Sequence, residues 1–225
     1  MDSSEVLKYL QAPLDLRAQE EIEAQYDFIS YQCEKVSRAY SLNWSKLAKA
    51  RLLSSNTLGR VKDSDLRNWD RANQYVNESL SQNEELSLSH VYKLNALVRN
   101  EASSIREIPI YGGHLEFIKP EYIEKALSLF EKKILTNLTL SPYEKAFHIY
   151  QWIVTIHPFH DGNGRTSRLC SDYVLLGSGI LPISFPSSFS SHVCQNINEK
   201  RRNKEDCYLS FLKAISHSYE ILLGE

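Results

Sequence analysis

The sequence of 225 residues has little glycine and proline, 8 and 7 residues, and no internal repeat. This excludes collagen-like chains and low-complexity disordered chains. A basic excess is also missing, because 26 Lys and Arg stand against 28 Asp and Glu, for a formal net charge of -2. Nucleic acids and anionic membranes are usually bound by clustered cations. The near-neutral balance therefore argues against a dedicated binder of either.

Long hydrophobic runs are absent as well. No window approaches the roughly 18 consecutive apolar residues of a membrane span, and the amino terminus lacks the layout of a signal peptide. We therefore expect a soluble, cytoplasmic protein without a membrane partner. A translocation signal read by a dedicated secretion machine need not be apolar, so transfer into a host cell stays open.

Cysteines are few, and none of them form a C-x-x-C spacing. Each lies in or beside an apolar stretch, which favours buried free thiols in a reducing compartment over a disulfide framework or a zinc site. The four residues are Cys33, Cys170, Cys194 and Cys207.

Apolar residues recur at helical spacing through most of the chain, and only the segment 108–118 has the β-branched and aromatic residues around a Gly-Gly pair that favour a hairpin. The predicted fold class is mainly α, a single helical bundle with one short β-hairpin. Residues 1–54 would form an N-terminal helical extension packed on a core of 55–225. The predicted helices cover about 22–40, 43–53, 63–80, 87–100, 120–134, 141–156, 164–176 and 208–222.

The residues that point to chemistry form the loop 157–168, whose sequence is HPFHDGNGRTSR. Glycines at 162 and 164 allow backbone N–H groups to turn inward at the start of the following helix, where the helix dipole favours an anion. Arg165 and Arg168 are three residues apart, so both guanidinium groups are expected to face one site. Two arginines above such N–H groups indicate a polyphosphate ligand.

Two other residues of this loop supply groups that the chemistry of a polyphosphate needs. Asp161 offers a hard oxygen ligand suited to Mg²⁺. His157 ends the preceding helix, and an imidazole titrates near neutral pH, so it is a candidate general base for a hydroxyl. A transition-metal site built from His157, His160 and Asp161 is an alternative, but it leaves both arginines unexplained.

The loop resembles the motif of the Fic (filamentation induced by cAMP) family, H-P-F-x-D-G-N-G-R followed by a further Arg, which here is Arg168. The resemblance extends over roughly 55–223 and includes Ala146, His148, Trp152 and Ile156 of the preceding helix. It implies a Fic-like helical fold and a protein adenylyltransferase, which transfers AMP from Mg-ATP to a Tyr, Thr or Ser hydroxyl of a target protein. Self-modification is a further outcome that it allows.

The resemblance also implies a role for each motif residue. His157 would be the base, Phe159 would anchor the loop, and Asp161 would hold Mg²⁺. Gly162, Asn163 and Gly164 would line the anion site, Arg165 would meet the inner phosphates and Arg168 the γ-phosphate. The segment 108–118 would be the flap that binds a target segment as an added strand.

Several alternatives stay open. Some Fic proteins carry an inhibitory Ser-x-x-x-Glu-Gly helix; the segment 54–59 matches it except at Leu58, which has no carboxylate, while 216–220 resembles a carboxyl-terminal version. The segment 47–61 also resembles a helix-turn-helix, which would make the chain a non-catalytic DNA- or nucleotide-binding module. Within the enzyme class, another nucleotide, phosphocholine transfer or removal of AMP would use the same base and anion site.

Overall fold

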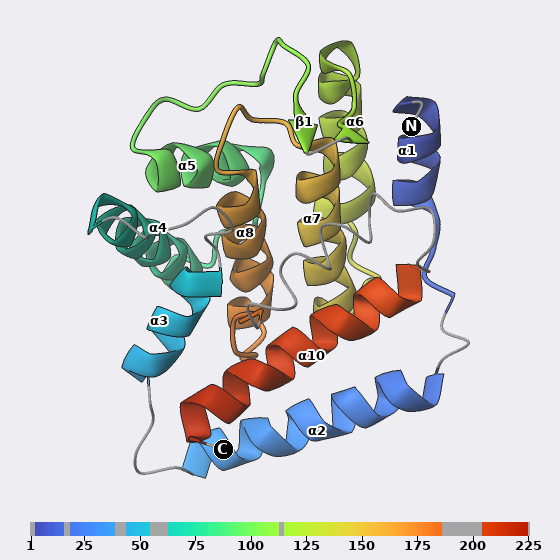
Figure 1. Cartoon of the computed structure of the whole chain (residues 1–225). Coiled ribbons are helices and arrows are strands. Elements are labelled where there is room, and N and C mark those ends of the chain that lie inside the picture. The colour runs from blue at the N-terminus through green and yellow to red at the C-terminus, as the bar shows by residue number, and fades with distance from the viewer. Residues whose placement is uncertain are drawn as a thin grey trace. The chain divides into compact units, whose positions relative to one another are not determined.

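The computed structural model describes residues 3–15, 19–38, 44–54, 63–112, 115–185 and 204–224. These residues form helices and one pair of short strands (Figure 1), so the predicted mainly α class is confirmed. They group into two compact units. Unit 1 comprises Met1–Ala12 and Lys62–Gly177, and unit 2 comprises Pro13–Val61 and Ser178–Glu225. The predicted boundary between an extension, 1–54, and a core, 55–225, is not tested by this grouping and stays a prediction.

Unit 1 contains the motif loop and most of the helices. Its elements are α1 (Ser3–Gln11), α4 (Asp63–Ser81), α5 (Leu88–Arg99), β1 (Tyr111–Gly112), β2 (Leu115–Glu116), a 3₁₀ turn (Pro120–Tyr122), α6 (Ile123–Phe130), a π-helical turn (Glu131–Leu135), α7 (Pro142–Ile156) and α8 (Asn163–Gly177). Helix α8 ends at Gly177, the first of two nearby glycines, Gly177 and Gly179, as expected from the low helix propensity of glycine.

Helix α7 is the central element of unit 1. The predicted capping box at its start is confirmed, because the backbone N–H of Glu144 donates to Ser141 Oγ at 3.2 Å and the N–H of Ser141 donates to Glu144 Oε2 at 3.0 Å. Every residue from Ala146 to Ile156 is buried. A helix that is buried on all sides is covered by neighbours on each face. These neighbours hold the helix in place, and with it the position of His157, which follows its last residue.

Helix α8 returns alongside α7, and the loop that joins them is short (Figure 1). Ser171 Oγ donates to the carbonyl of Ala146 at 2.8 Å and to Ser167 at 2.9 Å. Small side chains at this crossing allow the two backbones to approach closely. The pairing of α7 with α8 therefore holds the motif loop rigidly at one end of the helix pair.

Strands β1 and β2 pair antiparallel, with Tyr111 opposite Glu116 and Gly112 opposite Leu115. The backbone N–H of Phe117 donates to the carbonyl of Ile110 at 3.2 Å and extends the pairing by one step. Gly113 and His114, which would form the turn, lie outside the described residues. The pairing is compatible with the predicted hairpin, and the flap itself stays a prediction.

Helix α1 was not predicted from the sequence. It has nine residues and one short apolar stripe, Val6, Leu7 and Leu10, which is too little for a stable isolated helix. Its packing on α7 supplies what the sequence pattern lacks, since Gln151 Nε2 donates to Tyr9 Oη at 3.1 Å. Tertiary contacts thus stabilise a helix that local propensity does not.

Unit 2 is built from α2 (Gln19–Arg38), α3 (Trp44–Ser54), α10 (Lys204–Leu223) and the segment 178–185. The apolar stripe of α2 packs on α10, and two polar contacts fix the pair: the hydroxyls of Tyr26 and Tyr208 lie 2.6 Å apart, and Cys33 Sγ lies 2.7 Å from Tyr219 Oη. Helix α2 thus packs on another helix of the same chain.

Other expectations fall partly or wholly outside the described residues. Leu58 lies there, as does the part of the helix-turn-helix segment 47–61 that follows Ser54, so neither hypothesis is tested. Cys33, Cys170 and Cys207 form no disulfide; Cys170 and Cys207 are buried, as predicted, whereas Cys33 is only partly buried, and Cys194 is outside the described part. None of the helices within the described ranges has the length and apolar character needed to cross a membrane.

Candidate active site

His157 stands directly after the last residue of α7. Its backbone is left-handed, with φ 52° and ψ 59°, and its N–H donates to the carbonyl of Ile153 at 2.9 Å. Pro158 follows and disfavours the helical conformation at the residue before it. The helix therefore ends here, and the imidazole leaves the helix axis at a fixed point, where the sequence analysis placed it.

The imidazole of His157 is oriented by two neighbours. Its Nδ1 lies 3.3 Å from the carbonyl oxygen of Val154, and its ring stacks on Phe117, with 4.1 Å between ring centroids and 28° between planes. A carbonyl oxygen only accepts hydrogen bonds, so Nδ1 carries the proton and Nε2 keeps its lone pair. This is the tautomer that a general base acting through Nε2 requires.

Burial keeps this imidazole neutral. The pKa of His157 is lowered to about 4, and desolvation by burial is the main cause. The hydrogen bond to the Val154 carbonyl acts in the opposite direction, the nearby charge of Arg106 adds to the lowering, and the Asp161 carboxylate opposes it. At neutral pH the ring is therefore unprotonated and able to accept a proton.

Asn163 fixes the shape of the loop. Its side-chain Oδ1 accepts from the backbone N–H of Phe159 at 3.0 Å, and its Nδ2 donates to the carbonyl of the same residue at 2.8 Å. The Phe159 ring is buried and meets Tyr92 edge-to-face. The side-chain amide of Asn163 is thus used to hold the loop. Only its backbone N–H is left to contribute to an anion site.

The two glycines of the loop are needed for different reasons. Gly162 has φ +78°, and a Cβ there would lie 3.0 Å from Asn95 Nδ2 and 3.2 Å from both the Arg99 and the Val98 side chain. Gly164 is exposed, and a Cβ there would meet no atom within 4 Å. The first glycine allows α5 to pack against the loop. The second leaves open space above the first backbone N–H groups of α8.

Asp161 presents its carboxylate to solvent, with 72% of the side chain exposed. Its Oδ1 accepts from the Gly162 N–H at 2.6 Å and its Oδ2 lies 3.3 Å from Arg165 Nη2. The backbone carbonyl accepts from Asn95 Nδ2 at 2.9 Å, so the exposed side chain stands on a fixed backbone. A hard oxygen donor in this position suits Mg²⁺.

A protein cage for a metal is not formed. Among the described residues, no three or more His, Cys, Asp or Glu side chains group as metal ligands, and this includes the alternative set His157, His160 and Asp161. Mg²⁺ is characteristically held by one or two carboxylates together with substrate phosphates. Asp161 by itself fits that mode.

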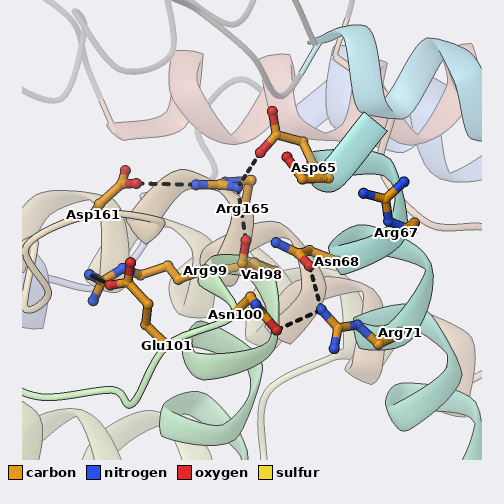
Figure 2. A pocket seen from close by; sticks show the side chains of 11 residues that line it. Asp65, Arg67, Asn68, Arg71, Val98, Arg99, Asn100, Glu101, Asp161 and Arg165 are labelled. Carbon is orange, nitrogen blue, oxygen red and sulfur yellow. Dashed lines mark hydrogen bonds and ion pairs between the residues drawn. The ribbon is translucent and has the colours of Figure 1, made fainter. Parts of the chain in front are cut away.

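Arg165 lies between two carboxylates at the edge of a pocket of about 370 Å³ (Figure 2). Its Nη1 donates to the carbonyl of Val98 at 2.9 Å and lies 3.6 Å from Asp65 Oδ1, and its Nη2 lies 3.3 Å from Asp161 Oδ2. This guanidinium group therefore ties α8 to α5 and α4 and holds Asp161 in place.

Arg168 does not line this pocket. It lies one turn further along α8 and is buried, with 6% of the residue exposed. This pocket takes Asp161 and Arg165 and neither His157, Gly164 nor Arg168. That both guanidinium groups face one phosphate site stays a prediction.

Two residues that shape the site were missed from the sequence. Asn95 is fully buried on α5 and links Asp161 to Thr166 and Ser103 through its amide. Asn95 follows Val91 by four residues and therefore lies on the same inner face of the helix, so helical spacing could have indicated that it is buried. Arg106, also fully buried, contacts the carbonyl of His157. Nothing in the local pattern around it distinguishes it from a surface arginine.

Comparisons with known proteins agree with this geometry. Residues 85–175 match the Fic/DOC family model. The protein adenylyltransferase fic-1 of Caenorhabditis elegans is 32% identical over 130 residues, which is 52% of this chain and 25% of the relative. The protein adenylyltransferase Fic of Drosophila yakuba is 30% identical over 158 residues, or 67% of this chain and 29% of the relative. The chain thus spans little more than a quarter of these curated relatives.

Solved structures show the same fold. Fic-1 from Caenorhabditis elegans matches with a TM-score of 0.63 and 19% identity, covering 90% of this chain and 69% of that one. A Fic domain-containing signalling protein from Bacteroides thetaiotaomicron matches with a TM-score of 0.57 and 17% identity, covering 99% and 96%. The resemblance first carried by the motif loop is therefore confirmed by independent comparisons, and the chain contains a Fic/DOC family domain over residues 85–175.

Proposed function

We propose that this chain is a protein adenylyltransferase that transfers AMP from Mg-ATP to a hydroxyl group of a protein. One observation carries the proposal: the same short loop presents, at the end of α7, an imidazole whose Nε2 bonds to none of the described residues and, at the start of α8, a glycine with open space above it. In-line transfer at phosphorus requires a base, charge neutralisation and positioning, and the loop supplies all three. The relatives named above as adenylyltransferases support the choice of AMP.

The step itself needs little from the protein beyond placement. The target hydroxyl oxygen attacks the α-phosphorus of ATP and forms an O–P bond, while His157 Nε2 takes the hydroxyl proton. The bond between the α-phosphorus and the bridging oxygen breaks, and pyrophosphate leaves with the electron pair. An imidazole whose pKa has been lowered to about 4 is in its basic form at neutral pH and is ready to accept this proton.

The start of α8 would bind the phosphates. The backbone N–H groups of Asn163, Gly164 and Arg165 are among the first in the helix and have no partner inside it by geometry. In the proposal, Arg165 acts on the inner phosphates while it holds Asp161, and the buried Arg168 adds positive charge one turn further along toward the γ-phosphate. Mg²⁺, held by Asp161, would neutralise charge that develops on the phosphate oxygens.

The paired segment 108–118 would hold the protein target. Its backbone lies next to His157, since Phe117 stacks on the imidazole. An extended target segment added at this edge would be fixed by main-chain hydrogen bonds, with its hydroxyl facing the base. For IbpAFic2, a solved structure similar to this chain shows a complex with adenylylated Cdc42, so a Fic-fold protein with a protein target is known.

The proposal is tested with ATP labelled either at the α- or at the γ-phosphate, incubated with Mg²⁺, the purified chain and a lysate. Label from the α-position should become attached to protein, and label from the γ-position should not. His157→Ala should reduce the rate by about 10²–10⁴, the range typical for loss of a general base. An unchanged rate in this variant would remove His157 as the base.

The donor is identified by a separate binding measurement. Thermal unfolding is followed with ATP, GTP, UTP and CDP-choline at equal concentration, each with Mg²⁺, because a ligand of the folded state stabilises it by RT ln(1 + [L]/Kd), so that the tightest ligand gives the largest shift. The largest shift is expected with ATP. A larger shift with CDP-choline would favour phosphocholine transfer, and binding of ATP without any transfer would favour the non-catalytic alternative.

A further inference from the structure

Arg106 is one of the largest fully buried side chains in the described part of the chain, with 1% of the residue exposed. It lies between α5 and β1, beside the motif loop: its backbone N–H donates to the carbonyl of Pro158 at 2.9 Å, and its neighbour Ile105 bridges to Phe159. A guanidinium group cannot lose its charge in a protein, so it is buried only where fixed acceptors surround it.

The acceptors are four backbone carbonyls from two places. At the end of α7, Arg106 Nε donates to His157 at 2.7 Å and Nη2 donates to Ile156 at 3.4 Å. At the two ends of the paired segment, Nη1 donates to Ile108 at 2.9 Å and Nη2 donates to Ile118. One planar group thus joins the residue that carries the base to both arms of the segment proposed to hold the target.

The contact between Phe117 and the imidazole depends on the same group. Phe117 precedes Ile118, whose carbonyl Arg106 holds, and its ring stacks on His157, whose carbonyl Arg106 also holds. The ring contact is therefore fixed from both sides by one rigid side chain. We propose that Arg106 is a positioning residue that sets the distance between the base and the target-binding segment 108–118. This inference rests on the proposed function.

If Arg106 positions the target-binding segment, substitutions of Arg106 should lower kcat/KM for the protein target and leave the affinity for ATP unchanged. Lysine keeps the charge but offers a single point of donation in place of a planar fork, so Arg106→Lys should leave some of the four carbonyls without a partner. Glutamine removes the charge as well. Both variants should lower kcat/KM for the protein target by on the order of a hundredfold, the cost of misplacing reacting groups by about 1 Å. ATP affinity should be unchanged, since the four carbonyls that Arg106 holds belong to the end of α7 and to the segment 108–118, and the phosphates would bind at the start of α8.

The matched control is Arg38→Gln, which changes an exposed arginine at the end of α2 that pairs with Glu34 at 3.2 Å. It should leave the kinetic constants of the target and the affinity for ATP unchanged. A loss of kcat/KM in the Arg106 variants that is accompanied by an equal loss of ATP affinity would contradict a positioning role, because it would indicate general damage to the site.

A second measurement does not depend on transferase activity. The charge of Arg106 helps to keep the pKa of His157 low, whereas the charge of Asp161 raises it. Because Arg106→Gln removes the first of these charges, NMR titration of the imidazole in this variant should give a pKa closer to the ordinary value. The ring-current shift that Phe117 causes in the imidazole should also change. If the folded variant keeps both unchanged, the inference is overturned. If the chain transfers no AMP, the proposed function fails while this titration still decides the role of Arg106.

Should neither variant fold, the unmodified protein gives the answer. The Nε–H of Arg106 should exchange with solvent far more slowly than that of an exposed arginine and should show a hydrogen-bond coupling to the carbonyl carbon of His157. Fast exchange without a coupling would overturn the inference.

Discussion

The two ends of the loop that joins α7 to α8 differ in their exposure to water. At the His157 end, an aromatic ring, a backbone carbonyl and a buried guanidinium group surround the imidazole. At the Asp161 end, a carboxylate with 72% of its side chain exposed shares a charged pocket with Arg165 and Asp65. Only three residues, 158–160, separate a desolvated group from a solvated one.

This difference follows from what each end has to do under the proposed function. A base must be unprotonated before it reacts, and desolvation disfavours the protonated imidazole. A metal ion carries charge that is expensive to bury, so the carboxylate proposed to hold it, Asp161, stays accessible. We therefore expect substitutions at the two ends of the loop to affect stability and activity differently.

After the loss of the base in His157→Ala, the largest expected effect is at the exposed end. Asp161→Asn should lower the rate of AMP transfer by on the order of a hundredfold, because a metal ligand is lost. Since its ion pair with Arg165 is exposed, the free energy of unfolding should change by less than about 1 kcal/mol. Labelling rates at saturating Mg²⁺ and urea unfolding measure the two quantities.

A matched carboxylate in the same pocket is the control for Asp161. Glu101→Gln removes an acid with a similar exposure, 65%, that pairs with Arg99. It should change neither rate nor stability appreciably. Equal rate losses in the two variants would mean that the overall charge of the pocket, and not a specific ligand, matters.

The two glycines should separate stability from binding. Gly162→Ala places a Cβ at a positive φ and 3.0 Å from Asn95, so it should destabilise the fold by about 1–3 kcal/mol. Gly164→Ala lies in a helix with free space around it and should stabilise the fold by about 0.5–1 kcal/mol. If phosphates bind over Gly164, the same variant should bind ATP more weakly. Urea unfolding and calorimetric titration with ATP test both, and an unchanged ATP affinity in Gly164→Ala would place the phosphates elsewhere.

The buried end predicts an unusual pH profile. Between pH 6.5, the ordinary pKa of histidine, and pH 4, the folded imidazole of His157 stays neutral, so transfer should remain nearly constant as pH falls from 7 to 5.5. Phe117→Ala should admit water and raise the pKa toward 6.5, which would leave about a tenth of the base active at pH 5.5. Rates at pH 5.5 and 8 compare the two proteins, and a wild-type midpoint near 6.5 would contradict the desolvated base.

The same lowered pKa has a consequence for stability. In the unfolded chain His157 takes up a proton below about pH 6.5, whereas the folded state resists protonation until about pH 4. The contribution of His157 to the free energy of unfolding should therefore fall as pH drops through this interval. Urea unfolding of the wild type and of His157→Ala across the interval isolates it.

The smallest effect is expected at the rim of the charged pocket. Asp65→Asn removes an ion pair at 3.6 Å from Arg165, and both side chains are partly exposed. The loss in the free energy of unfolding should be at most about 1 kcal/mol, and transfer should be nearly unchanged because Asp161 and the Val98 carbonyl still hold Arg165. A large loss of activity would instead assign Asp65 to metal or phosphate binding.

Much of the local structure could be predicted because its causes are local. The N-caps Ser141 and Ser87 stand at the starts of the predicted helices 141–156 and 87–100. Helix α1 could not be predicted, since its stability comes from α7, more than a hundred residues away. The sequence also could not show that Arg165 is shared among Asp65, Val98 and Asp161, because α4 and α5 supply two of these partners.

The sequence alone determined where α7 ends and α8 begins, since capping residues, a proline and glycines act within a few residues of chain. It also determined which chemical groups stand in the loop between them. Only the tertiary structure decided what those groups can do, because desolvation and hydrogen bonding depend on partners brought from distant segments. The lowered pKa of His157, the free Nε2 and the four carbonyls around Arg106 all arise in this way.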